Sequence, residues 1–154
     1  MKLDQNDYKI LNLLQSDSKM TNKQLSYQLN LSTTAVFERV KKMEKSGLIK
    51  NYTAILDRKM LGYELMVFTH VKLERHSGQN IIDFESQITV FDEVLECYHV
   101  SGDSDYILKM IFADMDDYRE FIVSKLTTIP SIGSTYSIFV INELKSVTKF
   151  DFKD

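Results

Sequence analysis

The sequence predicts an α+β protein of two parts: an N-terminal winged helix-turn-helix, followed by a ferredoxin-like α/β sandwich domain of βαββαβ order. Charge is the first observation, because residues 1–60 hold eleven lysines and arginines against six acidic residues, a net charge of +5. The whole chain carries −3, so residues 61–154 carry −8. Periodicity is the second, because apolar residues recur at helical spacing up to residue 45, and strand patterns alternate with helical ones from residue 64. A boundary after Met60 therefore separates a basic head, 1–60, from an acidic body, 61–154.

Length and composition fit a cytoplasmic protein. The 154 residues suffice for one ordinary domain or two small ones. No apolar run reaches the roughly 18 residues that a membrane span needs, and the opening residues MKLDQNDYK lack the apolar core of a secretory signal. The single cysteine, Cys97, has no internal disulfide partner. We therefore expect a protein of the cytoplasm that does not bind a membrane.

Three helices are predicted in the head, each with a capping residue before an apolar stripe. Asp4 caps the first helix, Thr21 starts a capping box for the second, and Ser32 caps the third. Gly47 lies just past the third helix, where left-handed backbone is favoured. The stretch LIKNYTAIL (48–56) is rich in β-branched and aromatic residues, which predicts a strand or a two-stranded wing.

A short helix, a break and a further helix describe a helix-turn-helix, whose last helix enters the major groove of double-stranded DNA. Ala35, Val36, Val40 and Met43 form the apolar face of the third helix, which leaves hydroxyl and charged side chains elsewhere. Hydroxyls suit bases or phosphates, and lysines suit phosphates. For Phe37, contact with a thymine methyl and burial against the first helix are equally open. The candidate DNA-binding residues are Thr21, Lys23, Ser32, Thr33, Thr34, Phe37, Glu38, Arg39, Lys41 and Lys42.

The body alternates strand and helix patterns. Strands are predicted over residues 64–74, 93–100, 105–113 and 134–144. The first intervening helix carries the stripe Ile81, Phe84 and Ile88. Asp114 caps the second helix, whose stripe is Met115, Tyr118, Ile122 and Leu126. This β-α-β-β-α-β order is the ferredoxin-like arrangement.

Two helices cover only one face of a four-stranded antiparallel sheet. The other face, which we expect to include Met66, Phe68, Phe139 and Ile141, is also apolar and needs cover. Exposed apolar patches of that size are rare on monomers. The sequence therefore predicts a homodimer, which would also match the two half-sites of a palindromic DNA site.

The segment from Leu3 to Gly62 resembles the N-terminal domain of the Lrp/AsnC, or feast/famine, transcriptional regulators. The similar motifs are the opening LDxxDxxIL pattern, the Leu-Ser before the third helix, the run ERVKKMEKSGLI and the Leu-Gly at residues 61–62. In the body, HVSGDSDYIL is similar to that family's ligand-domain hairpin, which typically reads Gly-Asp-x-Asp-Tyr. The resemblance spans nearly the whole chain. It implies a RAM-type effector domain, homodimers that often assemble into octamers, and an amino-acid effector bound between dimers.

The resemblance directs attention to the hairpin after the second strand. Gly102 permits close backbone approach and positive φ, Asp103 and Asp105 suit an α-ammonium group, and hydroxyls lie on the last strand. The candidate effector-binding residues are Gly102, Asp103, Ser104, Asp105, Tyr106, Thr135 and Ser137. A plain β-turn, which is commonly rich in Asp, Ser and Gly, explains the hairpin residues equally well. Ser104 stands where the family often has an aromatic residue.

Two other classes of function compete with this interpretation. The first is an enzyme, but the sequence has no glycine-rich phosphate loop and no metal-spaced set of Cys and His. Asp103-Ser104-Asp105 begins like a calcium loop, yet Ile107 stands where a third oxygen ligand is needed. We therefore expect no cofactor and no metal. The second is an amino-acid sensor that does not bind DNA, which the +5 head argues against.

Overall fold

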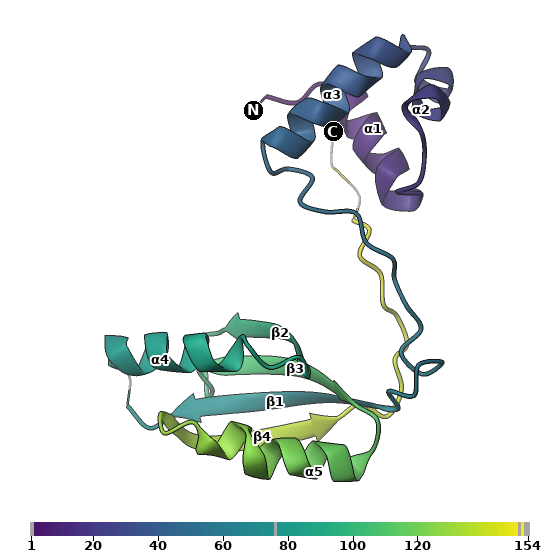
Figure 1. The fold of residues 1–154 in the computed structure, drawn as a ribbon. Coiled ribbons are helices and arrows are strands. Elements are labelled where there is room, and N and C mark those ends of the chain that lie inside the picture. Colours follow the sequence, from purple (N-terminus) through teal and green to yellow (C-terminus); the bar gives the residue numbers. More distant parts are fainter. Residues whose placement is uncertain (1, 76, 151, 153–154) are drawn as a thin grey trace. The chain divides into compact units, whose positions relative to one another are not determined.

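The computed structural model describes residues 2–75, 77–150 and 152, and it divides the chain into two compact units (Figure 1). One unit contains the residues up to Ile55 together with those from Leu144 onward, and the other contains Leu56–Glu143. The chain therefore passes between the units twice. This division differs from the boundary expected after Met60, and it assigns the residues after Glu143 to the head instead of the body.

The head is a bundle of three helices: α1 (Gln5–Ser16), α2 (Asn22–Leu29) and α3 (Thr33–Lys45). All three predicted caps are confirmed. Asp4 accepts the Asp7 N–H at 3.0 Å, Thr21 accepts the Gln24 N–H, and the Ser32 hydroxyl accepts the Ala35 N–H. The buried core combines residues from every helix: Ile10, Leu11, Leu25, Val36, Val40 and Met43.

The turn between α2 and α3 has the backbone that a tight helix-turn-helix requires. Asn30 adopts a left-handed conformation with φ 52°, which asparagine tolerates better than most residues. Gly47 ends α3 with φ 75°, as the sequence predicts. The strand or wing expected over residues 48–56 is not formed: none of these described residues lies in a strand, and the backbone N–H groups of Leu48 and Ile49 donate to the Met43 carbonyl of α3. A β-strand needs a partner, and the segment is extended without one.

The body is a four-stranded antiparallel sheet of order β2-β3-β1-β4 with two long helices on one face (Figure 1). Its elements are β1 (Leu65–Leu73), α4 (Gly78–Ile88), β2 (Val94–His99), β3 (Tyr106–Phe112), α5 (Met115–Ser124), the short 3-10 helix η1 (Leu126–Thr128) and β4 (Ile132–Phe139). The βαββαβ order is thus confirmed, although β4 ends at Phe139 and not at the predicted 144.

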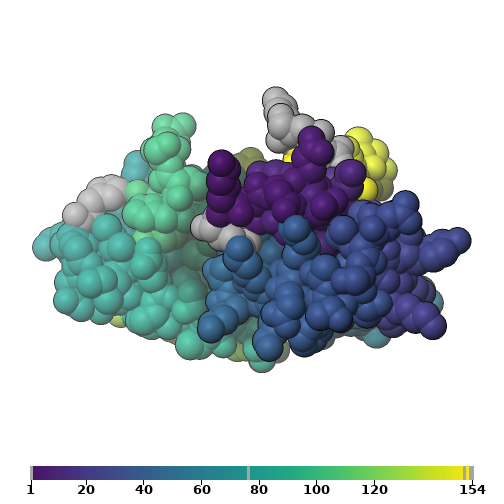
Figure 2. All heavy atoms as spheres, turned by 90° about the horizontal axis from the view of Figure 1, so that it is seen from above, coloured from purple at the N-terminus to yellow at the C-terminus, as the bar shows by residue number. Residues whose placement is uncertain are grey.

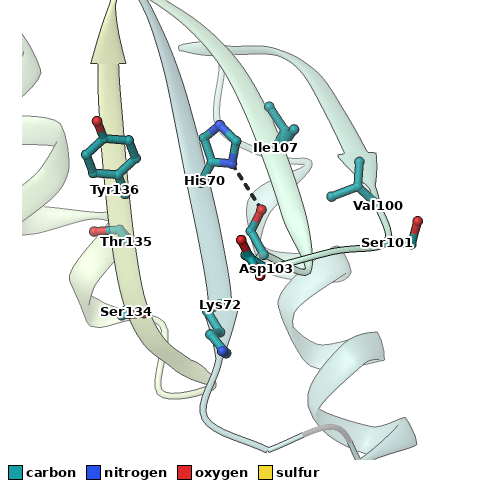
Figure 3. A pocket seen from close by; sticks show the side chains of 10 residues that line it. His70, Lys72, Val100, Ser101, Asp103, Ile107, Ser134, Thr135 and Tyr136 are labelled. Carbon is teal, nitrogen blue, oxygen red and sulfur yellow. Dashed lines mark hydrogen bonds between the residues drawn. The ribbon is translucent and has the colours of Figure 1, made fainter.

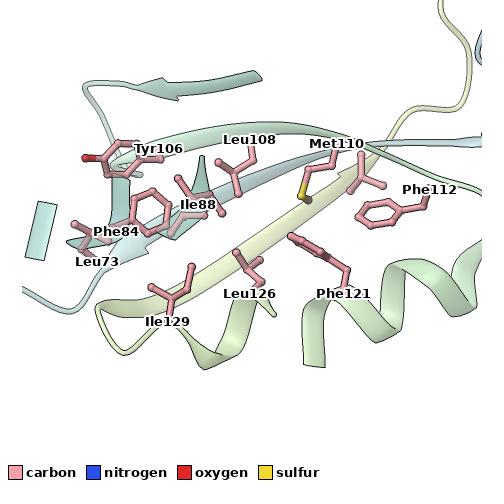
Figure 4. Packing of buried hydrophobic residues seen from close by; sticks show 12 residues of the cluster. Leu73, Phe84, Ile88, Tyr106, Leu108, Met110, Phe112, Phe121, Leu126 and Ile129 are labelled. Carbon is pink, nitrogen blue, oxygen red and sulfur yellow. The ribbon is translucent and has the colours of Figure 1, made fainter. Parts of the chain in front are cut away.

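The core of the body lies between the sheet and the helices (Figure 4). Phe84 from α4 packs on Tyr106 from β3 with ring centroids 4.5 Å apart. Phe121 from α5 is buried, and Met115 is half exposed, so the predicted stripe of α5 is wrong at its first position. Tyr118, Ile122 and Leu126 pack in or against the core as expected, and the predicted stripe omitted Phe121.

The open face of the sheet, which neither helix covers, is defined by strand register. His70 of β1 pairs with Ile107 of β3 and with Tyr136 of β4, so these side chains share that face. Phe68 pairs with Ile138 on the same face. Phe139 instead lies on the helix-covered face, where its ring meets Tyr118 of α5 at 5.0 Å. Its predicted place beside Phe68 was therefore wrong.

Candidate functional site

The outward face of α3 is polar and open along its whole length. Val36, Val40 and Met43 are buried, and the side chains on the opposite side of the helix are exposed. Those exposed residues are Thr34, Phe37, Glu38, Lys41, Lys42 and Lys45. In Figure 2 the blue atoms of α2 and α3 lie at the surface of the head. A helix that exposes hydroxyls at its start and lysines further along fits the major groove.

Arg39 was predicted to bind DNA, but its side chain forms ion pairs within the head. Its Nη1 donates to Asp4 Oδ2 and Asp7 Oδ1, each at 2.7 Å. The two carboxylates raise the pKa of Arg39. The backbone N–H of Asp7 and the Arg39 guanidinium lower the pKa of Asp4. The guanidinium therefore joins α3 to the start of α1 and does not belong to the outward face.

Three predicted hydroxyl residues have local partners within the head. The Thr21 and Ser32 hydroxyls cap α2 and α3 as described above. Thr33 Oγ1 lies 3.2 Å from Ser26 Oγ across the turn. The Ser32 and Thr33 hydroxyls stabilise the start of α3, and all three residues remain exposed. Lys23 on α2 is also exposed.

Two aromatic residues of the helix-turn-helix are exposed, Phe37 on α3 and Tyr27 on α2. Phe37 is 44% exposed, and Lys41 Nζ lies over its ring at 5.4 Å from the centroid. Burial of Phe37 against the first helix, one of the two alternatives, is thus not observed. Tyr27 on α2 is 87% exposed, and sequence reasoning missed it. Its spacing of four residues from Lys23 was the available signal, since residues four apart share a helix face.

The second candidate site is a cavity of about 620 Å³ at the hairpin end of the open sheet face (Figure 3). Its volume is within the usual range for small-molecule sites. His70 Nδ1 lies 3.0 Å from the Ser104 hydroxyl, which connects the sheet to the hairpin. The lining residues are His70, Lys72, Val100, Ser101, Asp103, Ser104, Ile107, Ser134, Thr135 and Tyr136.

The predicted effector residues divide between this cavity and the rest of the body. Asp103, Ser104 and Thr135 line it, and Gly102 holds the hairpin in left-handed backbone with φ 131°. Asp105 Oδ2 accepts the Leu73 N–H at 2.7 Å, so it braces the hairpin against β1.

Two predicted residues face the opposite side of the sheet. Tyr106 is 1% exposed in the core, and its hydroxyl donates to Glu85 at 2.8 Å. Burial and that carboxylate raise the pKa of Tyr106. The Ser137 hydroxyl lies 2.7 Å from Thr69 Oγ1, on the helix-covered face. Neither residue lines the cavity, because each makes its contact on the helix-covered face of the sheet.

Sequence reasoning missed the strand residues that make up much of the cavity wall. His70 and Lys72 alternate with the core residues of β1, and Tyr136 lies between Thr135 and Ser137 on β4. The strand register would have identified them, because it shows which residues of each strand point to the open face of the sheet. The wall combines a cation, Lys72, with a carboxylate, Asp103, beside apolar atoms of Ile107. That combination suits a small zwitterion with an apolar portion.

The described part of the chain contains no candidate metal-binding site. No group of three His, Cys, Asp or Glu residues is arranged there to hold a metal ion. Burial and the charge of Glu85 raise the pKa of Cys97, which disfavours its thiolate. No helix in residues 2–75 and 77–150 is long and apolar enough to cross a bilayer.

Comparison with family models covers both units. The model of the Lrp/AsnC ligand binding domain matches residues 66–150, and that of a winged helix-turn-helix DNA-binding domain matches residues 3–50. The candidate cavity lies within the first match, and the outward face of α3 lies within the second.

Individual proteins are similar over almost the full length. The leucine-responsive regulatory protein of Klebsiella pneumoniae is 36% identical over 151 residues, 98% of this chain and 92% of that protein. The leucine-responsive regulatory protein of Haemophilus influenzae is 39% identical over 143 residues, 93% of this chain and 86% of that protein. A transcriptional regulator from Neisseria meningitidis, solved in complex with L-Met, superposes with a TM-score of 0.91 at 31% identity, covering 97% of this chain and 96% of that one.

Proposed function

This chain belongs to the Lrp/AsnC family of transcriptional regulators, and from that membership we propose that an amino acid bound at the hairpin cavity adjusts how the head binds DNA. The members of this family are transcriptional regulators and not enzymes, which argues against the enzyme alternative. The observation that carries the proposal is the pairing of an open, lysine-bearing recognition helix with a cavity that offers both a cation and a carboxylate.

DNA recognition is assigned to the outward face of α3. Thr34 and Phe37 lie in its first half, where base edges are read, and Lys41 and Lys42 lie further along, where phosphates are met. Thr21, Lys23, Ser32 and Thr33 flank the entry to the groove, together with Tyr27. Glu38 lies between the base-reading and phosphate-binding positions, where a carboxylate accepts from cytosine N4. Arg39 holds α3 on α1 through its ion pairs.

The effector is assigned to the cavity beside the hairpin. The α-carboxylate of an amino acid would meet Lys72 and the α-ammonium would meet Asp103, while an apolar side chain would pack on Ile107 and Tyr136. Ser104 and Thr135 also line the wall. Gly102 acts through the backbone, because its φ of 131° suits glycine alone. Asp105, Tyr106 and Ser137 support the hairpin and sheet behind it.

Assembly follows from the surfaces that one copy leaves open. Tyr136 is 68% exposed and Ile138 is 43% exposed on the open sheet face, and Ile55 is 76% exposed in the extended segment 48–56. A second copy of the chain would cover these residues and give that segment a hydrogen-bonding partner. We therefore propose a homodimer as the working unit in the cytoplasm, with four dimers forming an octamer.

Selection of bound fragments from a random pool of double-stranded DNA tests the first assignment. The parent protein should enrich one motif, and Thr34→Ala should change the preference at one or two positions, because a lost base contact costs about 1–3 kcal/mol. Thr53→Ala is the matched control in the extended segment and should select the parent's motif. An unchanged motif for Thr34→Ala would show that the helix docks differently.

Thermal unfolding in the presence of each of the twenty amino acids tests the second assignment. At least one amino acid should raise the melting temperature, because a ligand at about 100 times its Kd stabilises by about 2.7 kcal/mol. Lys72→Met and Asp103→Asn should each remove that shift. Lys145→Met, far along the chain in an exposed segment, should retain it. Loss of the shift in Lys145→Met as well would argue against the cavity.

A further inference from the structure

The C-terminal tail, residues 144–150 and 152, lies against the first helix of the head and has no helix or strand of its own. Gln15 of α1 makes two hydrogen bonds with the backbone of Phe150: its Nε2 donates to the carbonyl at 3.1 Å, and its Oε1 accepts the N–H at 3.1 Å. A side-chain amide is one of the few groups that both donates and accepts. Gln15 therefore recognises this backbone as a neighbouring strand would.

Further contacts extend the same surface on both sides of Gln15. Lys149 Nζ donates to Ser16 Oγ at 3.0 Å. The ring of Phe152 lies 5.5 Å from that of Tyr8 and packs against the buried core of the head. The tail thus contacts α1 through polar groups of Gln15 and Ser16 near its end and through the ring of Tyr8 nearer its start.

The tail begins where the wall of the candidate effector cavity ends. β4 supplies Ser134, Thr135 and Tyr136 to that wall. Val140 then donates its N–H to the Met66 carbonyl at 2.9 Å, and the chain continues without a further element to the tail. One continuous stretch of about twenty residues therefore connects the cavity with α1.

We infer that the outward surface of α1 is a docking site for the C-terminal tail, and that the docked tail is a second connection through which the body acts on the head. The first connection is the chain at residues 55–56. The docked tail adds a second connection, which continues from β4. The docking contact stands by itself, and its role in transmitting an effector signal rests on the proposed function.

Fluorescence tests the docking contact in the full-length protein. The chain contains no tryptophan, so Phe152→Trp introduces the only indole. Its emission should be blue-shifted relative to the same protein in denaturant. Adding Gln15→Ala removes two hydrogen bonds and should move the docking equilibrium about 5- to 30-fold toward release, with emission shifting to the red. Gln5→Ala, an exposed glutamine on the same helix, should leave the emission unchanged. A solvent-like emission before the second substitution, or no response to Gln15→Ala, would overturn the docking site.

DNA titration with and without the amino acid tests the transmission. Gln15→Ala should retain the effector's thermal shift and lose most of its effect on DNA affinity, while Gln5→Ala keeps both. A Gln15→Ala protein whose DNA affinity still responds like the parent's would refute transmission through the tail. If no amino acid affects the parent, the proposed effector function fails and transmission with it, and the indole emission still decides whether the tail docks.

Discussion

Replacing Lys41 and Lys42 together with alanine should flatten the salt dependence of DNA binding. Both lysines are exposed on the outward face of α3, and Lys41 Nζ is held over the Phe37 ring at 5.4 Å. Each phosphate contact contributes a slope of about 0.9 log units of affinity per log unit of salt. Two lysines in each copy of a dimer therefore contribute about 3.6. Between about 50 and 200 mM salt, the parent should lose roughly 100-fold more affinity than the double variant.

Fluorescence anisotropy with one labelled duplex, repeated at five salt concentrations, measures both slopes. Arg39→Gln is the informative control, because its guanidinium is engaged by Asp4 and Asp7. That variant should melt at a lower temperature and, while folded, keep the parent's slope. A double lysine variant with an unchanged slope would remove these two side chains from the phosphate contacts. A flattened slope in Arg39→Gln would mean that its ion pairs open on DNA.

Three further predictions concern stability and assembly. Phe84→Ala should lower the free energy of unfolding by about 3–5 kcal/mol in urea titrations, because its side chain is fully buried. Ile82→Ala, at an exposed position of α4, should change that free energy by no more than about 0.5 kcal/mol. Equal effects of the two substitutions would contradict the packing. The pKa of Asp4 lies below its ordinary value of 3.8, so its contribution is present above that pH and is lost as pH falls through the folded-state value. Acid unfolding of Asp4→Asn should accordingly depend less steeply on pH below about 4 than that of the parent, and identical curves would count against the ion pair. Ile138→Asp should dissociate the assembly in sedimentation experiments, while Ile82→Asp should not, and a parent protein that sediments as a monomer would contradict the covered open face.

Much of the fold was predictable because its signals are local. Caps at Asp4, Thr21 and Ser32 need only the residues within one turn, and Gly47 needs only its own φ. Strand and helix order in the body likewise follows from short-range alternation. The strand expected over 48–56 failed because a strand depends on a partner that the residues themselves do not specify.

The errors in site prediction share one physical origin, which is the direction in which side chains point. On α3, Arg39 lies three residues after Val36 and one before Val40, so helical geometry turns it toward α1 and its carboxylates. On the sheet, Ser137 and Phe139 pair with Thr69 and Val67 on the helix-covered face. Counting strand residues does not fix that register. The cavity residue Tyr136 becomes visible only once the pairing is known.

Regulation by the proposed effector requires coupling of two sites, a cavity in the body and a recognition helix in the head. Coupling between binding sites is reciprocal, so an effector that changes DNA affinity by some factor must have its own affinity changed by DNA by the same factor. Calorimetric titration of the effector into the free protein and into its DNA complex, alongside DNA titration with and without effector, measures both factors. We predict that the two agree and lie within about 5- to 150-fold. A factor of one in both titrations, with the effector bound in each, would contradict regulation by this cavity.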